Sequence, residues 1–177
     1  MGDVRSHPPV LLLVAVITRH QAALDWARAK CTAQWGPVAI ESPTFDFAET
    51  SYYDATMGAG LGKTFLTFAG NYDPGELAAT KHLTNAWETE YAQTAGHMEP
   101  RPLNLDPGYI TQAKLVLAST KDHAHRIYLG QGMFAEITLF YKHKAWRPHE
   151  YTFPDYTRAD YHAFFTACRD RLRKPGG

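Results

Sequence analysis

VLLLVAVIT, the stretch at residues 10–18, is a run of aliphatic and β-branched residues without polar alternation. Such a run favours a central strand that is covered on both faces, or a core-facing strand of a small sheet. It is too short to span a bilayer, and no small-residue cleavage site follows it. We therefore expect the first strand of a sheet and no membrane span.

The residues that follow this strand change to helical and then to extended periodicity. A helix over residues 21–35, ended by Gly36-Pro37, is predicted from one apolar stripe: Leu24, Ala27, Cys31 and Trp35. A second strand is expected near residues 38–47. The alternating pattern of residues 63–69 predicts a third strand.

A second helix is predicted from residue 73 to about residue 95. Asp73-Pro74-Gly75-Glu76 supplies a capping residue, a proline at the first helical position and an acidic residue in the first turn. A short extended segment at residues 102–105 completes the order strand, helix, strand, strand, helix, strand. That order predicts a ferredoxin-like βαββαβ half with a mainly antiparallel sheet.

The C-terminal part has one ambiguous segment, residues 110–120. It can be a helix capped by Asp106-Pro107 or a strand built on Leu115-Val116-Leu117, and the helix is our preferred interpretation. Residues 125–129 and 133–141 predict a β-hairpin with a glycine-rich turn. A terminal helix is predicted from a further apolar stripe: Tyr161, Phe164, Phe165, Cys168 and Leu172. The expected fold is α+β, a single domain over residues 1–177, with the hairpin and the last helix extending the ferredoxin-like half.

Composition limits the class of partner. The chain has 177 residues, of which 45% are hydrophobic, and 18 basic residues balance 18 acidic ones. Without a global positive field, binding of duplex nucleic acid is not expected, although a local basic patch can hold a small anion. Cys31 and Cys168 fall on apolar helix faces, which indicates reduced, buried thiols and a cytoplasmic protein.

A glycine-rich loop at residues 58–64, ending in Gly62-Lys63-Thr64, resembles a phosphate-binding P-loop. The P-loop pattern requires a glycine where this chain has Met57, and its lysine should open a helix, whereas Lys63 is expected to open a strand. A P-loop is therefore rejected. The long connection 48–61, with Tyr52 and Tyr53, is either a lid over a pocket or a cover on the sheet.

The strongest concentration of polar side chains lies between residues 114 and 136. It comprises Lys114, Lys121, Asp122, His123, His125, Arg126 and Glu136. Cations beside an imidazole suit an anionic ligand, with Arg126 as a bidentate donor, His125 as acid or base and Glu136 as the group that orients them. A solvated, salt-bridged surface is the alternative. His123 and His125 could share a metal ion, but no third ligand is evident, so no metal site is predicted.

Several motifs together resemble a known family. They are NLDPGY at residues 104–109, AKLVLASTKD at 113–122, HRIYLG at 125–130, FAEITL at 134–139, YTFPDY at 151–156 and the first strand and helix up to Trp35-Gly36-Pro37. In these motifs the chain resembles the bacterial family called domain of unknown function 4416, over nearly its whole length. The resemblance implies a bacterial, cytoplasmic, single-domain protein. It carries over no catalytic residue, because that family has no established activity.

The leading hypothesis is a pocket for a small anionic ligand, phosphate-bearing or nucleotide-like, built from residues 104–136. His125 and Glu136 are the candidate catalytic residues. The candidate ligand-binding residues are Lys114, Asp122, Arg126, Asn104, Asp106 and Asp155. The carboxylates would orient these groups or bind a hard cation such as magnesium, and no cofactor is identified. The rival is a non-catalytic interaction protein or homodimer that uses the aromatic segment 146–156, and a single-stranded RNA binder is a third reading.

Overall fold

A nine-stranded sheet forms the centre of the computed structural model, which describes residues 2–3, 6–48, 54–70 and 72–173. The strands are β1 Leu11–Thr18, β2 Val38–Glu41, β3 Phe45–Asp46, β4 Gly62–Phe68, β5 Asn104–Ile110, β6 Lys114–Ser119, β7 Ile127–Gly130, β8 Met133–Lys142 and β9 Ala145–Pro148. The helices are α1 Gln21–Trp35, α2 Asp54–Met57, α3 Leu77–Thr94 and α4 Ala159–Arg173, with 3-10 turns at Pro74–Glu76 and Pro154–Thr157. The α+β class is confirmed.

The first half has the predicted topology. Its strands lie in the order β2-β4-β1-β5, and every neighbouring pair is antiparallel. This is the split βαβ arrangement of a ferredoxin-like half. The expected strand at residues 38–47 is two short strands, β2 and β3, which both pair with β4 on either side of Pro43. The sheet continues through β6, β8 and β7, and β9 pairs with β8.

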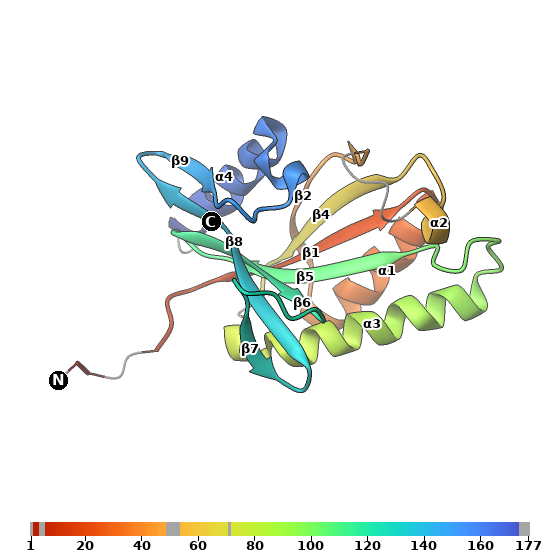
Figure 1. The fold of residues 1–177 in the computed structure, drawn as a ribbon, viewed down its shortest axis with the longest axis horizontal. Coiled ribbons are helices and arrows are strands. Elements are labelled where there is room, and N and C mark those ends of the chain that lie inside the picture. Colours follow the sequence, from red (N-terminus) through yellow and green to blue (C-terminus); the bar gives the residue numbers. More distant parts are fainter. Residues whose placement is uncertain (1, 4–5, 49–53, 71, 174–177) are drawn as a thin grey trace.

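Helices cover both faces of the sheet, which explains why β1 is apolar from Leu11 to Ile17. Leu12 and Val14 pack in a core with α1 and α3, whereas Leu13 and Ala15 pack in a second core with α4. Figure 1 shows α1 and α3 on one side of the sheet and α4 on the other. All eight residues of β1 are buried, so the covered central strand is confirmed.

The helix expected at residues 110–120 is wrong. Residues 104–110 form β5, residues 111–113 form a turn and residues 114–119 form β6. Thr111 fixes the turn, since its hydroxyl accepts hydrogen bonds from the backbone N–H groups of Ala113 and Lys114, both at 3.0 Å. Asp106-Pro107 lies within β5 and caps no helix. Burial on both sheet faces favours a β-branched, aliphatic strand at this position.

The sheet divides along β5. This strand pairs with β1 from Asn104 to Ile110, but it pairs with β6 only from Gly108 onward. A Cβ at residue 108 would overlap the carbonyl oxygen of Val116, so glycine permits the close approach of β6 there. Pro107 has no N–H to offer the neighbouring strand. As a result, residues 104–107 of β5 do not pair with β6. Beyond this point β7 and β8 extend toward α3 (Figure 1).

The hairpin predicted at residues 125–141 is confirmed as β7 and β8. Gly130, Gln131 and Gly132 all have positive φ in its turn, a conformation that glycine adopts without steric cost. The terminal helix is also confirmed as α4.

Candidate functional site

A cavity of about 710 Å³ opens where β5 and β6 separate. Its walls come from α3, from these two strands, from β8 and from the 3-10 turn before α4. Nine of its lining residues are charged Lys, Arg, Asp or Glu: Lys63, Lys81, Glu88, Arg101, Asp106, Lys121, Arg126, Glu136 and Asp155. The volume lies within the range of small-molecule sites, about 300–1,000 Å³.

Lys63 and Asp155 form a buried ion pair at one wall of the cavity. The Nζ of Lys63, at the start of β4, donates a hydrogen bond to Oδ2 of Asp155. The ammonium group also lies 4.2 Å from the ring centroid of Phe47 and 4.7 Å from that of Tyr156. Two aromatic faces and one carboxylate thus stabilise the charge of a lysine that is only 3% exposed.

Lys81 and Asp106 form a second pair, between α3 and β5. Lys81 Nζ donates hydrogen bonds to the Leu105 carbonyl and to Asp106 Oδ1, both at 2.9 Å. The other carboxylate oxygen of Asp106 accepts a hydrogen bond from Asn104 Nδ2 at 2.8 Å. Burial acts to raise the pKa of Asp106, but the charge of Lys81 and these hydrogen bonds hold it below its usual value. Lys63 also lowers this pKa, so the first two pairs interact electrostatically.

Glu88 and Arg101 form a third pair beside the second. Arg101 Nη2 donates to Glu88 Oε2 at 2.8 Å and also to Asn104 Oδ1. Glu88 Oε1 accepts a hydrogen bond from the Leu105 backbone N–H at 2.7 Å. Burial raises the pKa of Glu88 despite the nearby charges of Lys81 and Arg101. Neighbouring carboxylates whose pKa values move in opposite directions are typical of acid–base sites.

Arg126 and Glu136 form a fourth pair, on the β6–β8 side. Arg126 Nε donates to Glu136 Oε2 at 2.8 Å, and its Nη1 donates to Ser119 Oγ and to the Lys121 carbonyl. Glu136 is 3% exposed and also accepts from Thr138 Oγ1 at 3.1 Å. This pair fixes the segment between β6 and β7 against the sheet.

His125 contacts this pair from outside the cavity lining. Its Nε2 lies 3.3 Å from Glu136 Oε2, and its ring stacks on Tyr151 with centroids 4.0 Å apart. His123, which does line the cavity, lies parallel to His125 at 5.7 Å. His125 therefore contacts the ion pair from outside the cavity.

The structure brings together five of the eight residues predicted for the site. Around the cavity lie Asn104, Asp106, Arg126, Glu136 and Asp155. His125 does not line the cavity, but it contacts two residues that do, Glu136 and His123. Lys114 begins β6, at the end away from the cavity, and pairs with Phe140. Asp122 is exposed in the connection to β7 and does not line the cavity.

Four charged residues of the cavity were missed by sequence reasoning: Lys63, Lys81, Glu88 and Arg101. Lys63 was considered only as part of a P-loop, and its position in strand β4 confirms that this loop opens no helix. Lys81 lies on the same helix face as Leu77 and Thr84, and all three are buried. The sequence signal that could have identified Lys81 as a site residue is a lysine on the apolar stripe of a helix.

The connection at residues 48–61 covers part of the sheet in its described portion. Met57 of α2 and Leu61 pack with Ile17 and Phe47 in a small core. Tyr52 and Tyr53, on which the lid interpretation depended, lie outside the described residues.

The fold and the cavity define an α+β protein with a cavity, lined in part by charged residues, where the strands of an antiparallel sheet separate. The chain belongs to the family described as Domain of unknown function (DUF4416), which matches residues 8–172 and confirms the resemblance seen in the sequence. No curated protein and no solved structure gives a significant match. In the described part of the chain, no helix has the length and apolar character needed to cross a membrane.

Proposed function

We propose that the cavity between α3, β5 and β6 binds a small anionic ligand, such as a phosphate ester or a nucleotide. The observation that carries this proposal is the convergence of four ion pairs on one cavity. Buried ion pairs contribute little net stability, because desolvation of the charges offsets their attraction. Two of the four pairs, Lys63–Asp155 and Arg126–Glu136, are buried at both side chains, and the other two are more exposed at one member. Their convergence around one cavity is better explained by ligand binding than by folding alone.

The charge balance of the lining supports an anion. Five lysines and arginines face four aspartates and glutamates, which leaves one net positive charge with His123 neutral. A cavity with low-dielectric walls strengthens the effect of such a surplus. The ligand would bind beside the existing ion pairs without breaking them, because separating a carboxylate from its cation would cost several kcal/mol.

Some donors remain available within the described residues. Lys81 Nζ has two acceptors, so its third N–H has none, and Nη2 of Arg126 makes no hydrogen bond. Both side chains line the cavity. A phosphate oxygen accepts readily from ammonium and guanidinium groups, and such charge-assisted bonds are stronger than neutral ones.

The ring of His123 supports a ligand with a flat part. It stands parallel to the ring of His125, which stacks on Tyr151. A nucleobase or another planar group could continue this series of parallel rings on the cavity side. This feature favours a nucleotide over inorganic phosphate.

The test is a thermal-melt screen of the full chain against nucleotides, sugar phosphates and organic acids. A ligand at a hundredfold excess over its Kd adds about 2.7 kcal/mol. For a chain of this size, each kcal/mol of added stability raises the melting temperature by about 2–4 °C, so the expected shift is several degrees. The shift should disappear in Arg126→Gln and persist in Lys142→Gln, which removes an exposed cation from the far end of β8. A shift that survives Arg126→Gln, or none with any compound, would contradict the proposal.

A second candidate function, binding of a protein partner or a second copy of the chain, is favoured by the surface of β7. Ile127 and Tyr128 are 69% and 60% exposed on a strand that pairs only with β8 among the described strands. An apolar edge strand can add a strand from another chain. The segment 146–156 is less suited, since Trp146 and Tyr156 are buried in the core. Sedimentation of the wild type and of Tyr128→Lys tests the homodimer. An oligomer that forms in the wild type and not in the variant supports a homodimer through β7, and a monomeric wild type excludes it.

A further inference from the structure

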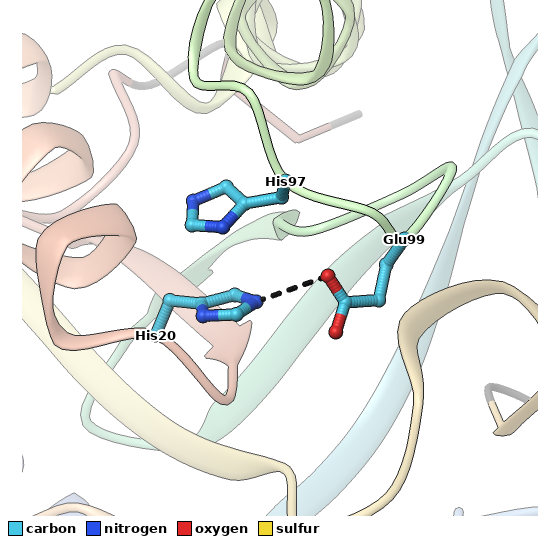
Figure 2. Close-up of side chains that lie close together, drawn as sticks. All are labelled: His20, His97 and Glu99. Carbon is cyan, nitrogen blue, oxygen red and sulfur yellow. Dashed lines mark hydrogen bonds and ion pairs between the residues drawn. The ribbon is translucent and has the colours of Figure 1, made fainter.

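Two imidazoles and a carboxylate meet at a place that the proposed function does not use. His20 precedes α1, while His97 and Glu99 lie in the segment between α3 and β5. Figure 2 shows the ring of His97 above that of His20, with the carboxylate of Glu99 beside them. We propose that these three residues bind one divalent cation of the zinc type, with water completing its coordination.

The distances suit such an ion. One potential ligand atom from each residue lies within 4.8 Å of the others. His20 Nε2 is 3.3 Å from Glu99 Oε2, and the two imidazole centroids are 3.9 Å apart with planes 24° from parallel. Tetrahedral zinc ligands at about 2.0–2.2 Å from the ion are roughly 3.4 Å from one another. The His20–Glu99 pair already has this spacing, whereas the ring of His97, which stacks on that of His20, must turn until its nitrogen points at the ion.

Groups around the cluster orient its members as supporting partners do in metal sites. Arg19 Nη1 lies 3.2 Å from Glu99 Oε1, the carboxylate oxygen that does not contact His20. The Tyr91 hydroxyl lies 3.0 Å from Nε2 of His97, which leaves Nδ1 for the ion. Metal-bound histidines usually hydrogen-bond through their second nitrogen, which fixes the tautomer and the ring orientation.

The donor set selects the class of ion. Two nitrogens and one carboxylate oxygen form the His₂Glu set of zinc sites that keep an open position. Imidazole also suits nickel and copper, whereas calcium and magnesium require sites composed of oxygen ligands. All three side chains are partly exposed, so an ion and its water can enter from solvent.

An ion here would link two parts of the molecule. It would join the start of α1 to the segment that continues into Arg101 and Asn104, both at the large cavity. The same segment is held by a hydrogen bond from Thr18 Oγ1 to the Pro102 carbonyl at 2.8 Å. His20 also lines a separate cavity of about 270 Å³ with Gly60 and Gly62, so a metal-bound water would lie next to open space.

The experiment is a calorimetric titration of the metal-free full chain with zinc chloride, and we expect one ion per chain. His20→Asn, His97→Gln and Glu99→Gln should each weaken binding by about tenfold or more, since even supporting residues contribute this much. Asparagine is a preferred helix N-cap, so His20→Asn leaves α1 intact. The matched control is His82→Gln, because His82 is exposed and, among the residues that the structure describes, hydrogen-bonds only to the Gln131 carbonyl. The zinc affinity of His82→Gln should equal that of the wild type.

Nitrogen NMR of the imidazoles gives a second readout that does not depend on any variant. Zinc should shift the ring signals of His20 and His97 and leave that of His82 in place. Absence of binding, or zinc affinity that is equal in all four variants and the wild type, would overturn the proposal. The latter result would mean scattered binding to surface histidines.

Discussion

The ammonium group of Lys63 and the carboxylate of Asp155 form an ion pair in the protein interior, with side chains only 4% and 6% exposed. The two residues are separated by 92 positions in the sequence, and their contact joins the start of β4 to the turn before α4. It also forms part of the wall of the large cavity. Folding therefore assembles the site from distant segments.

Removing one member of this pair should be costly. Lys63→Met leaves the Asp155 carboxylate buried without its cation, and such changes destabilise proteins by about 3–5 kcal/mol. The double variant Lys63→Met/Asp155→Leu removes both charges and should recover most of that loss. Urea unfolding of the two variants and the wild type measures these differences. A loss below about 1 kcal/mol in the single variant would contradict the buried pair.

Acid should remove the contribution of Asp106 to stability. The folded state holds the pKa of Asp106 below its usual value, so its contribution is fully present above about pH 3.9. It is lost as the pH falls through the lowered pKa. The destabilisation caused by Asp106→Asn should therefore be constant from pH 7 to about pH 4 and shrink below that. A penalty that is independent of pH down to full acid unfolding would show that the pKa of Asp106 is not lowered.

Glu88 should show the opposite dependence on pH. Burial raises its pKa in the folded state, so the folded protein binds a proton that the unfolded chain has already released. The contribution of Glu88 to the free energy of unfolding should decline as the pH rises from about 4.3 through the raised pKa. Glu88→Gln removes this decline, and its effect appears when the unfolding free energies of variant and wild type are compared between pH 4 and pH 7. Parallel curves would mean that the pKa of Glu88 is not raised.

The pairing of β5 with β6 depends on Gly108. Gly108→Ala places a methyl group against the backbone carbonyl of Val116, which cannot move as a flexible side chain can. Overpacking of this kind typically costs about 1–3 kcal/mol. We expect a lower melting temperature together with weaker binding at the cavity, because β5 and β6 must separate further. Gln112→Ala, in the exposed turn between β5 and β6 and away from the cavity, is the control for a small change beside these strands. An unchanged melting temperature in Gly108→Ala would refute the close approach.

Local periodicity was sufficient to predict most of the fold. The apolar run at β1 and the stripes of α1 and α4 report burial directly, because each element packs against the sheet along the face that its spacing defines. The segment 110–120 was misassigned because Asp106-Pro107 has the composition of a helix start. Only tertiary pairing shows that Pro107 lies within a strand and that Asp106 pairs with Lys81.

The site was predicted in part for a related reason. Arg126 and Glu136 are close in sequence and join through one hairpin, so their pairing could be anticipated. Lys63, Lys81 and Arg101 come from three other segments, and no spacing rule links them to residues 104–136. Their convergence follows from the strand order, which sequence periodicity alone does not determine.

The most direct test of an anion-binding cavity is an NMR titration of the ¹⁵N-labelled chain with nucleoside monophosphates and with inorganic phosphate. The account predicts saturable shifts that concentrate on the backbone amides of Leu105, Asp106, Ser119, Lys121 and Arg126, with nucleotides binding more tightly than phosphate. Shifts that are absent at millimolar ligand, or that fall on surfaces away from α3, β5 and β6, would contradict it.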